Sequence, residues 1–320
     1  MTINDMKQTK FNEASFTEWE QAAVKSLKGK SLESLETKTL EDIILKPLYT
    51  LADLENIPDE QTKTVRESKE SASWKVAQQS VGLTSEEILS DLNESLSKGN
   101  NVINYKVEIE HKWNDSQLQE LKELFQHYEV LLDVKNDPSF LKHFDYLNGS
   151  IIGAEEEFKG ARTLHLDGSK LHKAGGDAIS ELASVLVQAD TFVHLNGIEK
   201  VEENAFVQFS VDTNFFMEIA KLRAFRILWK AFGEAFGKEN AKAIPVYAET
   251  SLRSFSALDE TVNLLRAGNS TLSCVLGGAD FISAYPYNYL TGTTATSNRI
   301  ARNMQLVLKE ETHIQRVIDA

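Results

Sequence analysis

Histidine and carboxylate side chains are the groups of this chain best suited to acid–base chemistry, and two sets of them follow predicted strands. His165 and His172 bracket the sequence LDGSK, and His172 is the best single candidate for a general acid or base. A lone histidine is more often structural, so that alternative stays open. The segment VYAETS carries Tyr247, Glu249 and Ser251 at the end of another predicted strand. The Glu249 carboxylate could orient a substrate or simply accept hydrogen bonds from loop amides.

The spacings of common metal and nucleotide sites are missing from the sequence. None of its seven histidines lies in HExxH, and its one cysteine, Cys274, lies in an apolar run, as a buried inert thiol would. There is no Walker A motif, and no GxGxxG follows a predicted strand. We interpret Gly175-Gly176 and Gly277-Gly278 as sites of close helix–strand packing. TGTTATSN, before the last predicted helix, is more typical of a helix cap than of an anion site.

Charge and hydropathy exclude several classes of partner. The net charge is −14, and all of the acidic excess falls in residues 1–203, since residues 204–320 carry a net charge of +1. Such an excess argues against nucleic acid and anionic membranes as partners. No apolar run approaches the roughly 18 residues needed to span a bilayer. We therefore expect a soluble, cytoplasmic protein.

A strand-then-helix rhythm begins near Trp74 and must position these side chains. The expected strands are 74–79, 101–109, 128–134, 149–153, 162–167, 205–211, 243–248 and 280–285. The expected helices are 84–98, 115–127, 137–146, 174–188, 214–236, 256–275 and 295–310, with only a short connection after the fourth strand. Eight such units favour an α/β fold of the (β/α)8 TIM-barrel type over 71–320, although an open doubly wound sheet has the same rhythm.

The first seventy residues predict an arm that builds no core of its own. A short amphipathic helix is expected over 15–27, a strand or hairpin over 35–50, and an acidic linker over 51–70. We expect this arm, residues 1–70, to lie on the main domain or on a partner. Its Trp19 and Tyr49 are the candidates for contact with a partner chain.

Residues 214–229 form the most distinctive helix of the chain. Arg223, Arg226 and Lys230 fall in one narrow stripe, while apolar side chains cover most of the remaining circumference. An arc this wide indicates packing on a sheet and on a second surface. That second surface is either another part of this chain or another subunit. Phe216 and Trp229 are the candidate interface residues for the latter.

Several segments resemble the methylmalonyl-CoA mutase family of adenosylcobalamin-dependent isomerases. The similarity is strongest over about 174–320 and thin before residue 160. The segments that carry it are LKPLYT at 45–50, AGGDAISELASVL at 174–186, NFFMEIAKLRAFRILW at 214–229, LGGADFIS, and SNRIARNMQLVLKEETHIQRVIDA. They are similar, in that order, to the start of the family's barrel domain, to AGADAxxELA, to NFYMEIAKxRAxRxLW, to LGGTxS and to SxRIARNxQxxLxEES…VxD.

The positions that carry the family's chemistry differ in this chain. Aligned on the resemblance, Lys170 replaces the family's catalytic histidine unless a two-residue slip brings His172 there, and Gln79 replaces its catalytic tyrosine. The family's His-Cys-Gln-Thr-Ser segment, which contacts substrate, appears with Tyr247 and Glu249 in place of its His and Gln, and an Arg near the CoA moiety aligns with Asn204. The arrangement Lys170-x-His172-x-x-Gly175 is a coincidental likeness to the family's cobalt-binding motif.

This pattern resembles the small, non-catalytic subunit of heterodimeric bacterial mutases, ending before a cobalamin-binding domain. It implies no catalytic, cofactor-binding or metal residues in this chain, and adenosylcobalamin on a catalytic large subunit. It also implies a role in converting methylmalonyl-CoA and succinyl-CoA, with the N-terminal arm embracing the partner. Two alternatives remain: a divergent acyl-CoA mutase using His172 and Glu249 with a separate cobalamin chain, and a homodimeric acyl-CoA-binding barrel. A filled barrel interior would favour the subunit; an open axial channel would favour the enzyme.

Overall fold

Two compact units make up the chain, Met1–Pro58 and Asp59–Ala320. The computed structural model describes residues 3–9, 14–55 and 57–316. The segment from Asp59, expected in the arm, belongs to the second unit, because α4 (Asp59–Glu67) packs on α10 (Phe215–Ala235) through contacts such as the ion pair between Lys230 and Glu60 at 2.9 Å.

The first unit holds short elements and no buried core. Its helix α2 begins at a capping box, in which the Ser15 hydroxyl accepts from the Glu18 N–H and the Glu18 carboxylate accepts from the Ser15 N–H. None of its residues whose burial is described is buried. Residues 51–70, expected to be a linker, instead hold α3 and α4. The elements of this unit are α1 (Ile3–Gln8), α2 (Phe16–Ser26), η1 (Leu32–Leu35), the antiparallel pair β1 (Thr37–Lys38) and β2 (Ile44–Leu45), and α3 (Leu51–Leu54).

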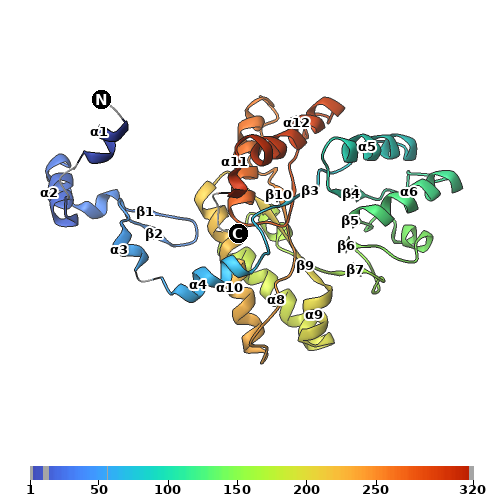
Figure 1. Cartoon of the computed structure of the whole chain (residues 1–320), viewed down its shortest axis with the longest axis horizontal. Helices are drawn as coiled ribbons and strands as arrows, with labels where there is room; N and C mark the ends of the chain where they lie inside the picture. The colour runs from blue at the N-terminus through green and yellow to red at the C-terminus, as the bar shows by residue number, and fades with distance from the viewer. Residues whose placement is uncertain (1–2, 10–13, 56, 317–320) are drawn as a thin grey trace. The chain divides into compact units, whose positions relative to one another are not determined.

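Parallel strands form the centre of the second unit (Figure 1). One sheet has the order β3-β11-β10-β9-β8 and the other β4-β5-β6-β7. β7 and β8 are separated only by Thr163 and form one interrupted strand. The strands are β3 (Lys75–Val76), β4 (Val102–Lys106), β5 (Glu129–Asp133), β6 (Gly149–Ile152), β7 (Ala161–Arg162), β8 (Leu164–Asp167), β9 (Ala205–Val211), β10 (Val246–Thr250) and β11 (Phe281–Ser283).

The two sheets close into a ring between β3 and β4. A parallel bridge joins Gln79 to Asn104, and the Ser80 N–H donates to the Asn104 carbonyl at 2.9 Å. The Asn101 N–H likewise donates to the Val76 carbonyl at 2.9 Å. With β7 and β8 counted as one, eight parallel strands surround one axis. The expected (β/α)8 barrel is confirmed, and the open sheet is excluded.

Helices cover the outside of the ring, and several differ from expectation. The helix expected over 137–146 is the 3₁₀ turn η2, which Asp137 caps and Pro138 opens. The helix expected over 174–188 is α8, which begins only at Ala178 and continues to Asn196; Gly175, with a φ of +97°, separates it from the short helix α7, which was not expected. Residues 256–261 precede α11 rather than belonging to it. The elements are α5 (Ser85–Ser97), α6 (Asp115–His127), η2 (Pro138–His143), α7 (Ser169–Lys173), α8 (Ala178–Asn196), α9 (Ile198–Asn204), α10 (Phe215–Ala235), α11 (Val262–Leu276), α12 (Ala295–Leu306), η3 (Val307–Glu311) and η4 (Ile314–Arg316).

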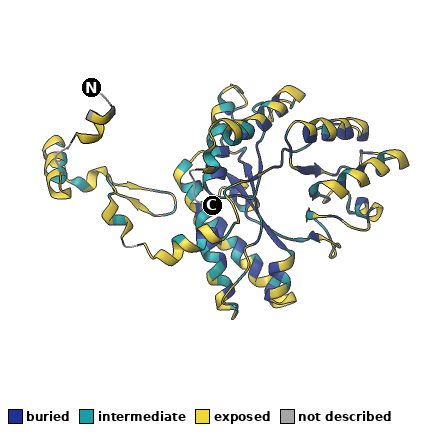
Figure 2. Cartoon of the chain, in the orientation of Figure 1, coloured by how far each residue is buried: buried dark blue, intermediate teal, exposed yellow. Residues whose placement is uncertain are grey.

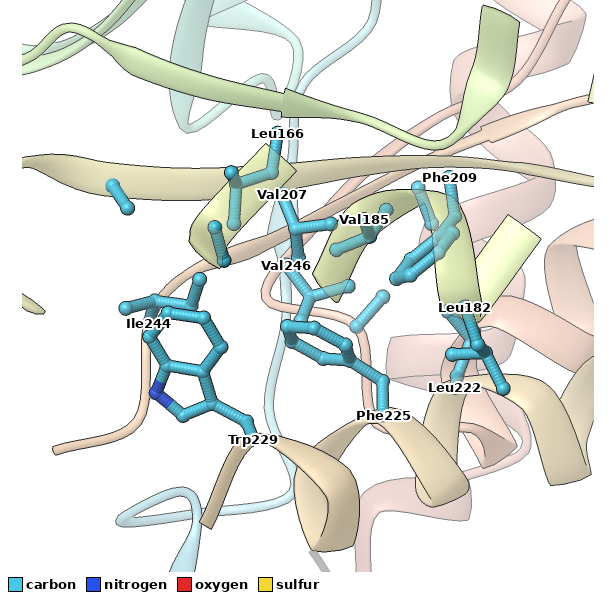
Figure 3. Close-up of a cluster of buried hydrophobic side chains, with 14 of the residues drawn as sticks. Leu166, Leu182, Val185, Val207, Phe209, Leu222, Phe225, Trp229, Ile244 and Val246 are labelled. Atoms are coloured by element: carbon cyan, nitrogen blue, oxygen red, sulfur yellow. The ribbon is translucent and has the colours of Figure 1, made fainter. Parts of the chain in front are cut away.

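Side chains alternate between the outside and the inside of the ring, as strands covered on both faces require. The outward positions pack under helices, so the strands are dark blue and the outer helix faces mostly yellow or teal in Figure 2. On one side Val207 and Val246 meet Val185 of α8 and Phe225 of α10 (Figure 3). A second cluster joins β4–β6 to α5 and α6.

The packing of helix α10 explains why its apolar arc is so wide. It packs on the strands, on α8, on α11 and on α4 of the same chain. The Trp229 ring is 3% exposed, and its indole N–H donates to the Lys242 carbonyl at 2.9 Å. This corrects the expectation that Trp229 faces a partner, because its own chain covers it. Phe216, in contrast, is 80% exposed. No helix in the described part of the chain is long and apolar enough to cross a membrane.

Candidate functional site

The interior of the barrel is filled with large side chains. Seven apolar residues, one from each of seven strand segments, meet along the axis: Ala77, Val102, Leu131, Ile152, Phe206, Tyr247 and Phe281. A small cavity of about 10 Å³, little more than the space of one water molecule, lies beside four of them, Leu131, Phe206, Tyr247 and Phe281. His165 adds to the plug, because its ring stacks on Phe206 with centroids 5.0 Å apart. A pantetheine-sized chain therefore cannot lie along this axis.

Tyr247 belongs to this plug and does not face a reaction space. Its hydroxyl is 3.4 Å from the Asn104 amide nitrogen. Burial, reinforced by the nearby Glu249 carboxylate, raises the pKa of Tyr247 well above its usual range. The phenol stays protonated; its ring packs the interior, and its hydroxyl accepts from the Asn104 amide.

Glu249 lies at the C-terminal end of β10, where barrel enzymes place their chemistry. Its carboxylate pairs with Lys173 at 2.9 Å and accepts from the Ser210 hydroxyl at 3.0 Å and the Tyr285 hydroxyl at 3.2 Å. Burial and then Glu249 itself raise the pKa of Tyr285, so that phenol remains a donor. Glu249 is thus held by side chains from three other segments rather than by loop amides. The carboxylate closes the centre of the barrel mouth.

His172 lies beside this closure in a buried hydrogen-bond chain. Its Nδ1 is 2.7 Å from Glu181 Oε1, and its Nε2 is 2.8 Å from the Ser251 hydroxyl. Glu181 in turn pairs with the Lys221 ammonium at 2.9 Å. His172 is 1% exposed and Ser251 3% exposed. The order Ser, His, Glu matches a hydrolase triad in its distances.

The contacts around this hydrogen-bond chain indicate that its role is structural. The Ser251 hydroxyl also accepts from the Arg253 N–H at 3.0 Å, and Lys221 neutralises the carboxylate that would orient His172 as a base. The chain joins α7, α8, α10 and the end of β10, so it ties four segments together under the mouth. Glu181 and Lys221 were not singled out from the sequence. The sequence feature that could have identified them is a charged residue on the sheet-facing side of an otherwise apolar helix.

His172 is also unsuited to binding cobalt. Both ring nitrogens of His172 are engaged, and the ring is buried. These residues do not fit a cobalamin cofactor, which supports the coincidental interpretation of the Lys170–Gly175 likeness. Among the residues that the structure describes, no group of three His, Cys, Asp or Glu could hold a metal ion.

Gln79 and Lys170 are not brought together. Gln79 follows the first strand of the ring and Lys170 the fifth, on opposite sides of the axis. Lys170 is exposed, and its N–H donates to the Asp167 carboxylate at 3.0 Å. Asn204 ends α9 and lines a hollow of about 360 Å³ together with Glu129 and Glu203.

A larger cavity of about 1160 Å³ opens beside the axis, over the loops that follow β3, β4 and β11. Gln79 lines it together with several acidic residues: Glu86, Glu87, Asp91, Glu94 and Glu108. Burial raises the pKa of Asp91, whose carboxylate accepts from the Val81 N–H at 3.1 Å. A wall so rich in carboxylates repels a carboxylated thioester.

The remaining sequence candidates have structural roles. Thr294 caps α12 by accepting from the Ser297 N–H at 3.1 Å, as expected of TGTTATSN. A Cβ at Gly277 would lie 2.6 Å from the Leu222 side chain, so this glycine permits close helix packing. Cys274 is buried, and burial raises the pKa of its thiol. In the arm, Trp19 is half-buried and Tyr49 is 55% exposed.

Comparison with known proteins supports the resemblance in sequence. The profile of the family described as methylmalonyl-CoA mutase matches residues 140–320, more than half of the chain. A probable methylmalonyl-CoA mutase small subunit of Mycobacterium bovis is 36% identical over 172 residues, which cover 50% of this chain and 28% of that protein. A methylmalonyl-CoA mutase small subunit of Porphyromonas gingivalis is 35% identical over 179 residues, which cover 53% and 29%. The match thus spans less than a third of either relative.

Among solved structures, a dihydropteroate synthase from Thermus thermophilus aligns with a TM-score of 0.38 at 13% identity, covering 73% of this chain and 94% of that one. That likeness is too weak to argue from, and the barrel stands on the strand pairing itself. The family match, residues 140–320, covers the strands from β6 onward and the helices α7 to α12. On these grounds the chain belongs to the methylmalonyl-CoA mutase family.

Proposed function

We propose that this chain is a non-catalytic subunit of a methylmalonyl-CoA mutase, supporting a catalytic partner chain that interconverts methylmalonyl-CoA and succinyl-CoA. The filled axis carries the proposal. Phe206, Tyr247 and Phe281 occupy the volume that a thioester arm would need, and the cavity beside these three side chains is only about 10 Å³. A filled interior is the outcome that the sequence analysis associated with a subunit rather than an enzyme.

The electrostatics of the mouth support the same conclusion. A carboxylated thioester approaching the axis would meet Glu249, which is 5% exposed and already paired with Lys173. Displacing Lys173 would leave a buried carboxylate facing the substrate's own carboxylate, and two like charges at short range disfavour binding. Gln79 and Lys170, which replace the family's tyrosine and histidine, lie on opposite sides of the ring.

The partner in this proposal is the catalytic large subunit, which would carry the adenosylcobalamin. The two relatives described above are named small subunits, a name that implies a larger companion chain. The first unit suits contact with such a chain, because it buries none of its described residues and presents Tyr49 and Phe16 at 55% and 51% exposure. Trp19 and Phe216 are further contact candidates. We place the complex in the cytoplasm.

Isothermal titration tests the proposal. Methylmalonyl-CoA is titrated into this chain at millimolar ligand, with and without adenosylcobalamin, and a catalytic mutase chain serves as the positive control. We expect no saturable heat from this chain. Saturable micromolar binding that is lost in Glu249→Ala or His172→Ala would overturn the proposal and favour an active barrel. Saturable binding that survives both changes would instead favour an acyl-CoA-binding protein with its site elsewhere.

Co-expression with a catalytic large chain tests the positive part of the proposal. The two chains should co-purify through size-exclusion chromatography, and mutase activity should survive Glu249→Ala in this chain. Loss of turnover in that variant, with the complex intact, would show that this barrel contributes to the chemistry.

A further inference from the structure

The large cavity beside the barrel axis, about 1160 Å³, has no part in the proposed function. Its lining is strongly acidic, with five carboxylates: Glu86, Glu87, Asp91, Glu94 and Glu108. Lys106 is the only lysine or arginine in the described lining, and it pairs with Glu108 at 2.6 Å. The other four carboxylates form no salt bridge within the described part of the chain. A cavity with this charge attracts cations.

Three of these carboxylates form a stripe along α5. Glu87, Asp91 and Glu94 stand at positions i, i+4 and i+7, so they follow one face of the helix at intervals of about 6 Å and 4.5 Å along its axis. Among the residues that the structure describes, no group of three His, Cys, Asp or Glu could hold a metal ion. The stripe therefore does not converge on a single ion. It fits a ligand that carries several positive charges along a chain.

The middle of the stripe is short of positive charge. The Asp91 carboxylate accepts from the Val81 N–H at 3.1 Å, and burial raises the pKa of Asp91. The Arg302 guanidinium, on α12, lowers that pKa but does not outweigh burial. An ammonium group beside Asp91 would offset the cost of keeping this carboxylate charged.

The rest of the lining suits ammonium groups and the alkyl chain between them. Ser80 lines the cavity and is 5% exposed, and its hydroxyl has no hydrogen-bond partner among the described residues, so it is free to accept from an N–H. The rings of Tyr285 and Tyr289, with centroids 4.6 Å apart, line another part of the cavity, and aromatic faces attract ammonium groups. Val81 and Pro286 offer apolar surface to methylene groups.

We propose that this cavity binds a linear polyamine, whose ammonium groups lie along the stripe formed by Glu87, Asp91 and Glu94. The inference concerns a cavity outside the barrel axis, and it does not depend on the proposed mutase role. A slender alkyl chain fits such a cavity better than a basic protein segment does. The alkyl chain brings no main-chain polar groups that would need hydrogen-bond partners inside the cavity.

Isothermal titration of spermidine into the full chain tests the proposal, at an ionic strength of about 0.01 M to limit screening. We expect saturable binding at micromolar spermidine. Asp91→Asn combined with Glu94→Gln should weaken this binding about tenfold or more, as expected when charged hydrogen bonds are lost. Asparagine at the first position can still accept from the Val81 N–H, so the fold is kept. Spermidine should likewise raise the Tm of the wild type more than that of this double variant.

A matched control separates the cavity from the general negative charge of the chain. Glu155→Gln combined with Glu156→Gln removes the same charge from an exposed loop after β6, across the ring from the cavity, and should leave the affinity unchanged. Equal weakening by the two double variants overturns the proposal, as does the absence of saturable binding. Displacement of spermidine by Mg²⁺ at equal total charge also overturns it, because the attraction is then diffuse. An oligolysine peptide that binds more than about tenfold tighter than spermidine would overturn it too, and would assign the cavity to a basic protein segment.

Discussion

Replacing Lys221 by methionine should destabilise the barrel severely. The Lys221 side chain is 0% exposed and lies between two carboxylates, Glu218 at 2.7 Å and Glu181 at 2.9 Å, while also donating to the Ser210 carbonyl at 2.8 Å. Burial alone would lower the pKa of Lys221, but Glu218 and Glu181 outweigh it and raise that pKa. The ammonium therefore remains charged throughout the neutral range.

The magnitude follows from what the methionine leaves behind. Breaking a buried ion pair by removing one partner costs about 3–5 kcal/mol, because an uncompensated charge stays in the interior. Here two carboxylates, 2% and 7% exposed, lose their shared cation. A domain of ordinary stability has about 5–15 kcal/mol in total, so Lys221→Met removes a large share of it.

Urea unfolding at pH 7 measures this cost. The matched control is Lys230→Met on the same helix, because the Lys230–Glu60 pair is exposed and such pairs contribute about 0–1 kcal/mol. Adding Glu181→Gln to Lys221→Met should recover part of the loss, since one stranded charge is then removed. If Lys221→Met costs no more than Lys230→Met, the buried cluster does not stabilise the fold as argued.

Four further substitutions probe other parts of the barrel. Burial lowers the pKa of His165 from about 6.5 to about 4, so stability that is present above pH 6.5 should be lost as the pH falls toward 4, by up to about 3 kcal/mol. His165→Phe should therefore flatten the dependence of the urea midpoint on pH in this range. An unchanged pH profile in that variant would contradict the prediction. Gly149 has φ +146°, and a Cβ there would overlap the Val130 carbonyl, so Gly149→Ala should cost well over about 1 kcal/mol by thermal unfolding; a Tm within a degree of wild type would refute the clash. Trp229→Ala should cost about 3–5 kcal/mol, whereas Phe216→Asp should change stability by less than about 0.5 kcal/mol while weakening any pairing with a catalytic chain in a pull-down assay.

The strands could be predicted because each is a short apolar run, covered on both faces. The side chains of β9 and β10 point alternately toward the barrel axis and toward the outer core. The apolar runs around Val207 and Val246 were therefore enough to predict both strands. The number of strands favoured a closed barrel but could not exclude an open sheet, since the closure depends on the Gln79–Asn104 bridge between segments with no pairing signal of their own. The fourth unit has no helix after β6, so strand counting alone left the open sheet as an alternative.

The fate of Glu249 could not be predicted from VYAETS. Its partners Lys173, Ser210 and Tyr285 come from three separate segments, which only the closed ring brings to one point. A local sequence shows that a carboxylate ends a strand; it does not show whether a cation from elsewhere neutralises it. His172 illustrates the same limit, because Glu181 and Ser251 engage both of its nitrogens.

The segment that most resembles the mutase family makes contacts that are structural rather than catalytic. In NFFMEIAKLRAFRILW, Lys221 ties the mouth of the barrel through Glu181 and the Ser210 carbonyl. Five residues later Arg226 ties the opposite end, donating to the Ile244 and Gly278 carbonyls and pairing with Asp280 at 2.8 Å. These contacts hold the ring closed and touch no reaction space. A chain can therefore keep this motif whatever side chains its barrel mouth carries, because the contacts of Lys221 and Arg226 belong to the scaffold.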